Sequence, residues 1–461
     1  MTFSGGFFNA FPYVNAATQY NTAMFFQKGE VDMNKDLFAL KGTICYSLTP
    51  RTINFMENSY VVCENGICAG TFSTLPDEYQ NIKVVDMGDQ LIIPGFTDLH
   101  LHAPQYAYRG TGMDLELLEW LNTITFPQEA RYADLSYAKK AYSIFVEDLK
   151  NSFTTRACIF ATLHRPATEL LMDLLEESGL TTMVGKVNMD RNGSPQLQEE
   201  SAASARDTRQ WLEEISGRYE HTYPILTPRF TPSCTDELMT ELGKIQKEYH
   251  LPIQSHLSEN FGEIAWVKEL CPASRFYGDA YDQFGLFGDP NGGKECPTIM
   301  AHCVHSTDEE IQMIKDHGVY IAHCPASNTD IASGIAPIRH YLNMGLHVGL
   351  GTDVAGGFSL SMFRAIADAI QVSKLRWRLL DQEQSPITLE EAFYMATLGG
   401  GSFFGKVGTF EKGYEFDALV LDDSNLSHPQ EITSRDRLER LVYLSDDRNL
   451  TAKYVQGRKV R

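Results

Sequence analysis

Eight short apolar runs, each followed by a longer amphipathic stretch, most restrict the fold of this 461-residue chain. Such runs are typical of buried parallel strands, and the stretches between them are typical of helices packed on a sheet. The runs are Leu91 to His102, Thr155 to Leu163, Thr182 to Asn188, Pro224 to Phe230, Pro252 to Leu257, Thr298 to Cys303, Val319 to Cys324 and Leu346 to Thr352. Eight βα units predict a (β/α)8 TIM-type barrel, with a doubly wound sheet as the alternative.

The residues at the ends of these runs distinguish the two folds. Barrel enzymes carry their chemistry at the carboxyl ends of several strands. Imidazoles or a carboxylate stand at five run ends here, namely His100 with His102, His256, His302, His323 and Asp353. No GxGxxG phosphate-binding turn follows any run, so the doubly wound fold lacks its usual support. We therefore expect a barrel with its chemical groups at one rim.

Short β-type runs flank the barrel region at both ends. They lie between Leu37 and Val85 and return after Gly413, separated by turn signals. We expect residues 33–93 and 408–461 to form one small β-sandwich domain beside a barrel of residues 94–407. Residues 1–32 match neither pattern, so we expect an N-terminal extension that is disordered or that precedes a translation start at Met33.

Composition excludes several kinds of partner. With 60 acidic against 39 basic residues, the formal charge of -21 repels phosphate backbones and anionic lipids, so neither nucleic acid nor a membrane is expected. The sequence contains no apolar stretch of about 18 residues and no charged leader before an apolar run. Nine dispersed cysteines without a CxxC pair argue against a disulfide framework and a thiolate zinc site. A soluble, cytoplasmic protein is expected.

Three histidines and one aspartate form a candidate metal site. His100 and His102 are two residues apart, so a strand projects both to one side. His256 adds a third nitrogen and Asp353 a carboxylate, a set that suits one Zn²⁺ per subunit, or Fe²⁺, with room for water. A bound metal lowers the pKa of its water to about 7, so metal-assisted hydrolysis is expected. Asp353 could instead be a turn residue after Gly351.

Glu259, three residues beyond His256, is the candidate proton shuttle. The attacking water must lose a proton while the leaving group gains one, and a carboxylate in a dry pocket can move both. The alternative is a carboxylate at a helix N-terminus. His302 is expected to orient the attacking water. Structural, loop or packing roles are expected for Asp98, His305 and His323.

Taken together, four segments resemble the amidohydrolase superfamily. They are Pro94 to Gln105, Ser255 to Asn260, Ala301 to Cys303 and Gly349 to Gly357. More narrowly, the sequence resembles the guanine deaminases of that superfamily, and this resemblance covers about Leu37 to the end. It rests on His102 to Gln105, Leu117 to Leu121, Thr125 to Pro127, Pro228 to Pro232 and His323 to Asn328.

The resemblance implies hydrolysis of guanine to xanthine and ammonia in a homodimer. It implies that the metal ligands are His100, His102, His256 and Asp353. Glu259 would be the proton shuttle, and Asp353 would accept the water proton. The residues implied to hold the purine are Gln105, Arg229 and Phe230, together with His256 and Glu259. Arg229 could alternatively form an ion pair at the rim.

Two other functions stay open at this point. The same metal site could act on another heterocycle, such as 8-oxoguanine, a pterin or a triazine, although Gln105, Arg229 and Phe230 argue against it. The fold could also serve as a catalytically silent scaffold, which would need neither the ligand set nor Glu259. The Gly- and aromatic-rich stretch from Cys271 to Cys296 could be a lid or a surface insertion.

Overall fold

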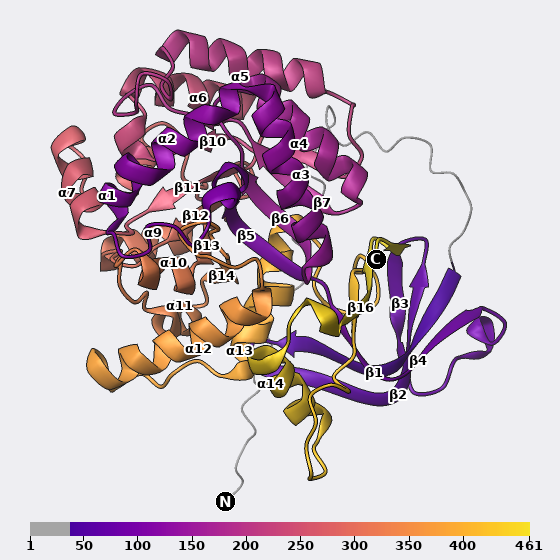
Figure 1. Cartoon of the computed structure of the whole chain (residues 1–461). Helices are drawn as coiled ribbons and strands as arrows, with labels where there is room; N and C mark the ends of the chain where they lie inside the picture. Colours follow the sequence, from indigo (N-terminus) through magenta and orange to yellow (C-terminus); the bar gives the residue numbers. More distant parts are fainter. Residues whose placement is uncertain (1–36) are drawn as a thin grey trace, which may run out of the picture.

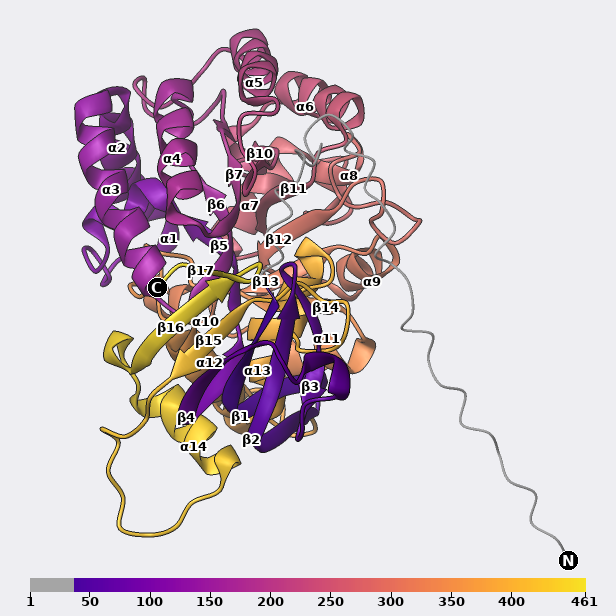
Figure 2. The same cartoon turned by 90° about the vertical axis from the view of Figure 1, so that its right-hand side faces the viewer.

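The computed structural model describes residues 37–461, and the expected extension of residues 1–32 lies outside the described residues. Figures 1 and 2 show a large unit of helices around parallel strands, with a smaller strand-rich unit at one side. In the smaller unit, the yellow C-terminal strands lie beside the indigo N-terminal ones. Both ends of the described chain therefore build the same unit.

Four parallel strands form the first sheet of the large unit, in the order β5-β6-β7-β9. They are β5 (Phe96–His102), β6 (Thr154–Phe160), β7 (Thr181–Gly185) and β9 (Thr222–Pro224). Almost every residue in them is buried, which explains why the sequence shows short runs without the alternation of a half-exposed strand. The long helices of this half are α3 (Leu135–Asn151), α4 (Arg165–Ser178) and α5 (Ser201–Ile215).

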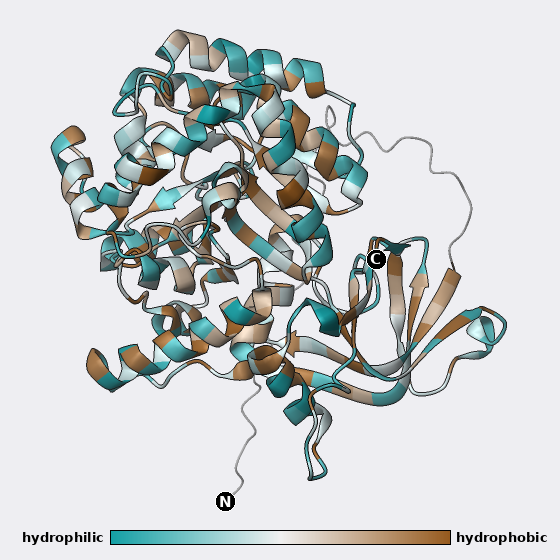
Figure 3. Ribbon diagram, in the orientation of Figure 1, coloured by the Kyte–Doolittle hydropathy of each residue, from teal (hydrophilic) through white to brown (hydrophobic). Residues whose placement is uncertain are grey.

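A second parallel sheet has the order β11-β12-β13-β14. Its strands are β11 (Ile253–Leu257), β12 (Thr298–His302), β13 (Tyr320–His323) and β14 (His347–Leu350). The helices of this half are α6 (Asp236–Tyr249), which precedes β11, and α7 (Phe261–Leu270), α8 (Asp279–Asp282), α9 (Asp308–Asp316), α10 (Pro325–Asp330), α11 (Ile338–Met344), α12 (Met362–Leu379) and α13 (Leu389–Tyr394). In Figure 3, helices α5 and α6 alternate teal and brown, as amphipathic helices on a buried sheet do.

The predicted fourth strand is irregular. It is divided into β9 and β10 (Thr227–Pro228), and β10 pairs with β8 (Val187–Asn188) in a separate two-stranded sheet. Pro224 and Pro228 lack amide hydrogens, so this segment cannot donate along a continuous ladder. Between β9 and β10, Leu226 makes a parallel bridge to Ile253 of β11, which links the two parallel sheets on this side.

On the opposite side, the sheets meet where β14 lies against β5. The amide of Asp353 donates to the carbonyl of His100 at 2.8 Å, and the amide of His102 donates to the carbonyl of Val354 at 2.8 Å. The last predicted run is thus hydrogen-bonded to the first, and the large unit is a mixed α/β structure with parallel sheets.

The smaller unit is one seven-stranded sheet with the order β17-β16-β15-β4-β1-β2-β3. Its strands are β1 (Leu37–Thr49), β2 (Thr52–Glu64), β3 (Ile67–Phe72), β4 (Lys83–Pro94), β15 (Ala418–Leu421), β16 (Leu450–Val455) and β17 (Arg458–Lys459). Strand β15 pairs antiparallel with β4, with Val420 opposite Ile92. The strands belong to a single sheet, and their arrangement as a sandwich stays a prediction.

Short helical turns fill the connection from β5 to α3, which covers one side of the site described below. They are η2 (Ala103–Tyr108), α1 (Leu117–Trp120), η3 (Leu121–Thr125), α2 (Phe126–Glu129) and η4 (Ala130–Ala133). The other helices are η1 (Asp77–Tyr79), η5 (Thr231–Ser233), η6 (Met395–Gly399), η7 (Ser402–Phe404), α14 (Ser434–Leu444) and η8 (Asp447–Asn449). None of the helices in residues 37–461 is both long and apolar enough to cross a membrane.

Candidate active site

Two histidines at the end of β5 reach the same carboxylate. His100 and His102 have ring centroids 4.9 Å apart, and their Nε2 atoms lie 3.2 and 3.4 Å from Oδ1 of Asp353. Asp353 follows β14 and is held against β5 by its amide bond to the His100 carbonyl. Its φ of 46° lies in the left-handed region, a strained conformation for a non-glycine residue that recurs at functional sites.

His256 brings a third imidazole from β11. Its Nδ1 donates to the carbonyl of Arg229 at 2.6 Å, and since a carbonyl only accepts, Nε2 carries the lone pair. This Nε2 lies 3.3 Å from Nε2 of His102. Burial, and then the neighbouring His100, lowers the pKa of His102 and His256 well below the usual range. Both rings are therefore neutral, which is the form that binds a metal ion.

The imidazoles and the carboxylate form two overlapping groups that could hold a metal ion. Within each group the candidate ligand atoms lie within 4.8 Å of one another, and the groups are His100 with His102 and His256, and His100 with His302 and Asp353. His100 is fully buried, yet within residues 37–461 neither of its ring nitrogens makes a hydrogen bond of good geometry. A bound cation would satisfy such an orphaned donor atom.

Asp353 is an anion at this site. Burial alone would favour its neutral form, but the histidines beside it, His100 first, lower the pKa of Asp353 below its usual range. Three imidazole nitrogens beside one carboxylate oxygen match the donor set of an open catalytic zinc or iron site. The sequence-based alternative, a simple turn residue, does not account for the contacts of Asp353 with two imidazoles.

Glu259 lies directly after β11 and is 3% exposed. The hydroxyl of Ser333 donates to its Oε1 at 2.9 Å, and Oε2 lies 3.4 Å from Nε2 of His302. Burial, and then the charge of Asp353, raises the pKa of Glu259 to about 8, against the opposing effect of the Ser333 hydrogen bond. A carboxyl group with a pKa near the working pH can both accept and donate a proton.

Helix α7 begins immediately after Glu259 and is capped by other residues. Asn260 and Glu263 form a capping box, and Glu263 Oε2 accepts from the amides of Glu259 and Asn260 at 3.1 and 3.4 Å. The hydroxyl of Tyr277 donates to Glu263 Oε1 at 2.8 Å. Burial, followed by the charge of Glu259, raises the pKa of Glu263 to about 7. The capping role that the sequence left open for Glu259 is thus filled by Asn260 and Glu263.

His302, at the end of β12, lies between the two carboxylates. Its Nε2 is 3.4 Å from Glu259 Oε2 and 3.8 Å from Asp353 Oδ2. Its Nδ1 lies 2.9 Å from Oδ1 of Asn328 in α10, a bond in which Nδ1 donates. The φ of 76° at His302 is also left-handed. The ring is therefore fixed where a polar group between Glu259 and Asp353 would contact it.

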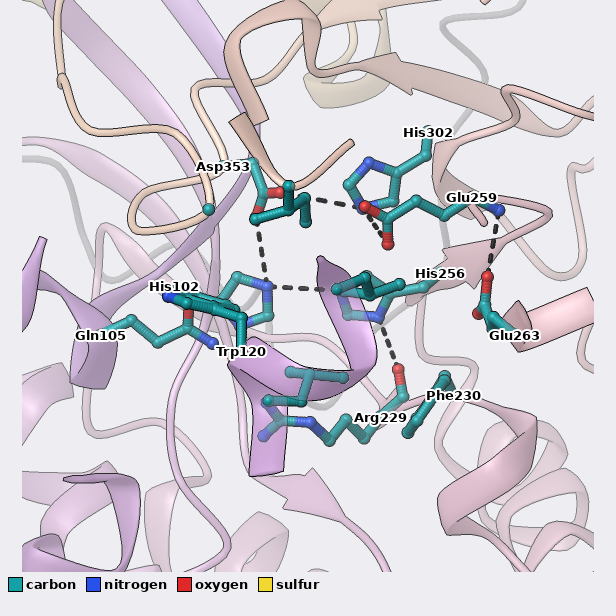
Figure 4. Close-up of a pocket in the computed structure, with 14 residues that line it drawn as sticks. His102, Gln105, Trp120, Arg229, Phe230, His256, Glu259, Glu263, His302 and Asp353 are labelled. Carbon is teal, nitrogen blue, oxygen red and sulfur yellow. Dashed lines mark hydrogen bonds and ion pairs between the residues drawn. The ribbon is translucent and has the colours of Figure 1, made fainter. Parts of the chain in front are cut away.

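A pocket opens beside this cluster, and Figure 4 shows its lining. It encloses about 440 Å³ of empty space including its opening. The lining residues are His102, Gln105, Leu117, Trp120, Leu121, Arg229, Phe230, His256, Glu259, Glu263, His302, Ile331, Asp353 and Gly356. In Figure 4, His102, His256 and Asp353 point toward one another, and Gln105 and Arg229 lie away from Glu259.

The predicted purine-binding residues share one buried carboxylate. Glu129, the last residue of α2, accepts two bonds from Arg229, NH1 to Oε2 at 2.5 Å and NH2 to Oε1 at 3.1 Å. Gln105 Nε2 donates to the same Oε1 at 2.8 Å. The ring of Phe230 lies beside His256, with centroids 6.5 Å apart. Arg229 therefore forms an ion pair, as one alternative expected, and it does so while lining the pocket.

Other sequence candidates lie behind the pocket. Asp98 accepts hydrogen bonds from Thr352 and from the amide of His100, a structural position. His305 Nε2 donates to the carbonyl of Ser333 at 2.7 Å, and His323 is buried within β13. None of the pocket-lining residues comes from 271–296, so this stretch does not line the pocket as a lid would. Its Tyr281 instead donates to the carbonyl of His256 at 2.9 Å.

Sequence reasoning missed five residues around the pocket: Trp120, Glu129, Glu263, Asn328 and Ser333. Four of them had some signal. Trp120 and Asn328 lie inside segments of the family resemblance, and Glu129 follows Thr125 to Pro127 by two residues. Glu263 could be predicted as the third residue after Asn260, because that is the position of the partner in a capping box. Ser333 follows no motif, and only the fold brings it to Glu259.

Comparisons with known proteins identify the family of this chain. The model of the amidohydrolase family matches residues 91–460. Guanine deaminase of Dictyostelium discoideum is 37% identical over 453 residues, covering 93% of this chain and 99% of the relative. The mouse (Mus musculus) enzyme of the same name is 39% identical over 385 residues, covering 80% and 83%.

A solved structure with substrate is also similar. The crystal structure of guanine deaminase from C. acetobutylicum with bound guanine in the active site superposes with a TM-score of 0.89 and 48% identity, covering 92% of this chain and 100% of that one. The resemblance to guanine deaminases that the sequence predicted is therefore confirmed, and the chain belongs to the amidohydrolase family.

Proposed function

We propose that this protein hydrolyses guanine to xanthine and ammonia in a metal-dependent reaction. The observation that carries the proposal is the juxtaposition of the three-imidazole, one-carboxylate cluster with Glu259 on one side of a pocket and Gln105 with Arg229 on another. The similarity to a guanine deaminase with bound guanine supports the substrate. Adenine presents a donor where guanine presents a carbonyl, and the donors of this pocket fit the carbonyl.

The ligands of one Zn²⁺ would be His100, His102, His256 and Asp353, and Fe²⁺ suits the same donors. The fit is supported by the neutral imidazoles, by the orphaned ring nitrogens of buried His100 and by the 3.3 Å approach of the His102 and His256 Nε2 atoms. When bound, the ion would supply Lewis-acid activation of the water that attacks the purine.

Glu259 is the proton-transfer residue of the proposed reaction. With a pKa raised to about 8, its carboxyl can take a proton from the attacking water and pass it to the ring nitrogen beside the carbon that bears the amino group. Asp353 accepts the second water proton, and the amino group leaves with it as ammonia. His302, fixed by Asn328, contacts the attacking oxygen between the two carboxylates. The atoms of guanine and water are thus all accounted for in xanthine and ammonia.

The other end of the pocket holds the purine in this proposal. Arg229 and Gln105 donate to the acceptor edge of the ring, while Phe230 and Trp120 contact its faces or edges. His256 and Glu259 approach the reacting carbon. Purified, metal-replete protein tests this assignment: we expect ammonia release from guanine and none from adenine, whereas adenine turnover would contradict it.

We also propose the finer architecture. The parallel sheets close into a (β/α)8 barrel of residues 94–407, supported by the Leu226 bridge to β11 and the hydrogen bonds from Asp353 and His102 across β14 and β5. Residues 33–93 and 408–461 form the small β-sandwich domain, supported by the pairing of β4 with β15. The homodimer and the cytoplasmic location stay predictions.

A further inference from the structure

We infer that Glu129 is a positioning residue that fixes the two hydrogen-bond donors by which this pocket recognises the purine carbonyl. The inference rests on the proposed function and adds a residue that does not itself line the pocket. Glu129 is 1% exposed and ends α2 in the connection between β5 and α3. It lies behind Gln105 and Arg229, and its carboxylate bonds to both.

The first donor that Glu129 fixes is the guanidinium of Arg229. Two of its five N–H groups, one each on NH1 and NH2, bond to the two oxygens of Glu129. The ring of Phe126 lies beneath the guanidinium, 5.1 Å from its carbon. Burial alone would lower the pKa of Arg229, but Glu129 raises it above its usual value, so the buried group stays charged. The fork is held at one edge, and its remaining N–H groups face away from Glu129.

The second donor is the side-chain amide of Gln105, whose orientation is determined by its neighbours. Nε2 donates to Glu129 at 2.8 Å, while Oε1 accepts from the amide of Ala355 at 3.2 Å. A carboxylate cannot donate and a backbone amide cannot accept, so the reversed orientation of the Gln105 amide would lose both bonds. The second N–H of Nε2 is left to face the pocket that Gln105 lines.

Glu129 therefore makes this end of the pocket a donor-only surface. Its carboxylate accepts one N–H of Gln105 and two of Arg229 behind the pocket, and it leaves their remaining N–H groups for the ligand. Guanine presents two acceptors, O6 and N7, on one edge, whereas adenine replaces O6 with an amino donor. A site built to bond a particular polar group rejects an analogue that lacks it far more strongly than an apolar pocket can.

The test compares guanine with 2-aminopurine, which keeps the reacting amino group but lacks O6. In Glu129→Gln, the neutral amide keeps the side-chain shape but presents an NH2 to Gln105 or Arg229, so one donor must move. We expect kcat/KM for guanine to fall about 10²-fold, the size seen when a contact is misplaced by about 1 Å, with most of the loss in KM. The kcat/KM for 2-aminopurine, followed through its own fluorescence, should fall by less than about threefold.

A matched control is Asp417→Asn, which changes a buried carboxylate that bonds Arg156 twice, far along the chain in the smaller unit. It should lower the melting temperature without changing the preference for guanine over 2-aminopurine. If Glu129→Gln does not fold, Glu129→Asp keeps the charge but retracts it by one methylene, and guanine should again lose at least about tenfold more than 2-aminopurine, the worth of one charge-assisted hydrogen bond.

Equal losses on guanine and 2-aminopurine in the Glu129 variants would overturn the inference, because a merely structural role would weaken both. Wild-type protein that leaves guanine unchanged would instead contradict the proposed function. The two failures are therefore distinguishable in one set of measurements. A loss on guanine that exceeds the loss on 2-aminopurine, with unchanged metal content, supports the positioning role.

Discussion

Glu259→Gln is expected to remove turnover and, in the metal-free protein, to raise stability at alkaline pH. The amide has the shape of the carboxyl group but cannot carry a proton between water and purine. General acid–base groups contribute about 10² to 10⁴ in rate, and Glu259 handles the proton of both the nucleophile and the ring, so a loss near about 10⁴ in kcat is expected. Metal content should stay at the wild-type level, because Glu259 is not among the proposed ligands.

The stability effect follows from the pKa of Glu259. Its value in the folded protein, about 8, is above the ordinary glutamate value of 4.5, so the folded state binds the proton more tightly than the unfolded state. The stability of wild type therefore falls relative to the glutamine variant as the pH rises from 4.5 through about 8. At about 1.4 kcal/mol for each pKa unit, the full difference is on the order of 5 kcal/mol above pH 8 and under about 1 kcal/mol at pH 5.

The assay is urea unfolding of chelator-treated wild type and variant at pH 5 and pH 9, beside ammonia release by the metal-loaded proteins. Glu310→Gln is the matched control. Glu310 is also buried, and it accepts from Ser258 and the amide of Gly278, bonds that an amide can preserve if the hydroxyl reverses. The control should retain turnover. Retained turnover in Glu259→Gln, or an equal stability difference at both pH values, would refute the reasoning.

Three further changes have defined outcomes. Asp353→Asn replaces a proposed ligand by a neutral one, so metal analysis should show at least about tenfold weaker binding, and full occupancy would remove Asp353 from the ligand set. Arg229→Lys cannot make the forked pair with Glu129, so KM for guanine should rise about tenfold or more in steady-state kinetics, and an unchanged KM would exclude the role of Arg229. Gly185→Ala would place a Cβ 1.7 Å from Thr227 Oγ1, so urea unfolding should show a loss of about 1–3 kcal/mol, and wild-type stability would contradict this packing.

The candidate ligand cluster could be predicted from the sequence because it depends on local rules. A strand projects residues two apart to one side, and parallel strands bring their carboxyl ends to one edge. His100, His102, His256 and Asp353 therefore follow from the run ends, and the structure brings these four together. Glu259 follows because it comes immediately after the strand that carries His256.

The supporting residues could not be predicted from the sequence, because their partners are distant in the chain. Glu129 is separated by 24 positions from Gln105 and by 100 from Arg229, and no periodicity relates them. Ser333 reaches Glu259 across 74 positions. The irregular fourth strand was also missed, since Pro224 and Pro228 interrupt hydrogen bonding inside a run whose apolar pattern is continuous.

The most direct test of the account is the conversion of guanine to xanthine by purified protein, followed by ultraviolet absorbance and ammonia release, with and without a chelator. Adenine, cytosine and 8-oxoguanine serve as comparison substrates. The account predicts turnover of guanine that the chelator abolishes and added Zn²⁺ restores. Metal-replete protein that leaves guanine unchanged, or that converts it equally well after complete metal removal, would contradict the account.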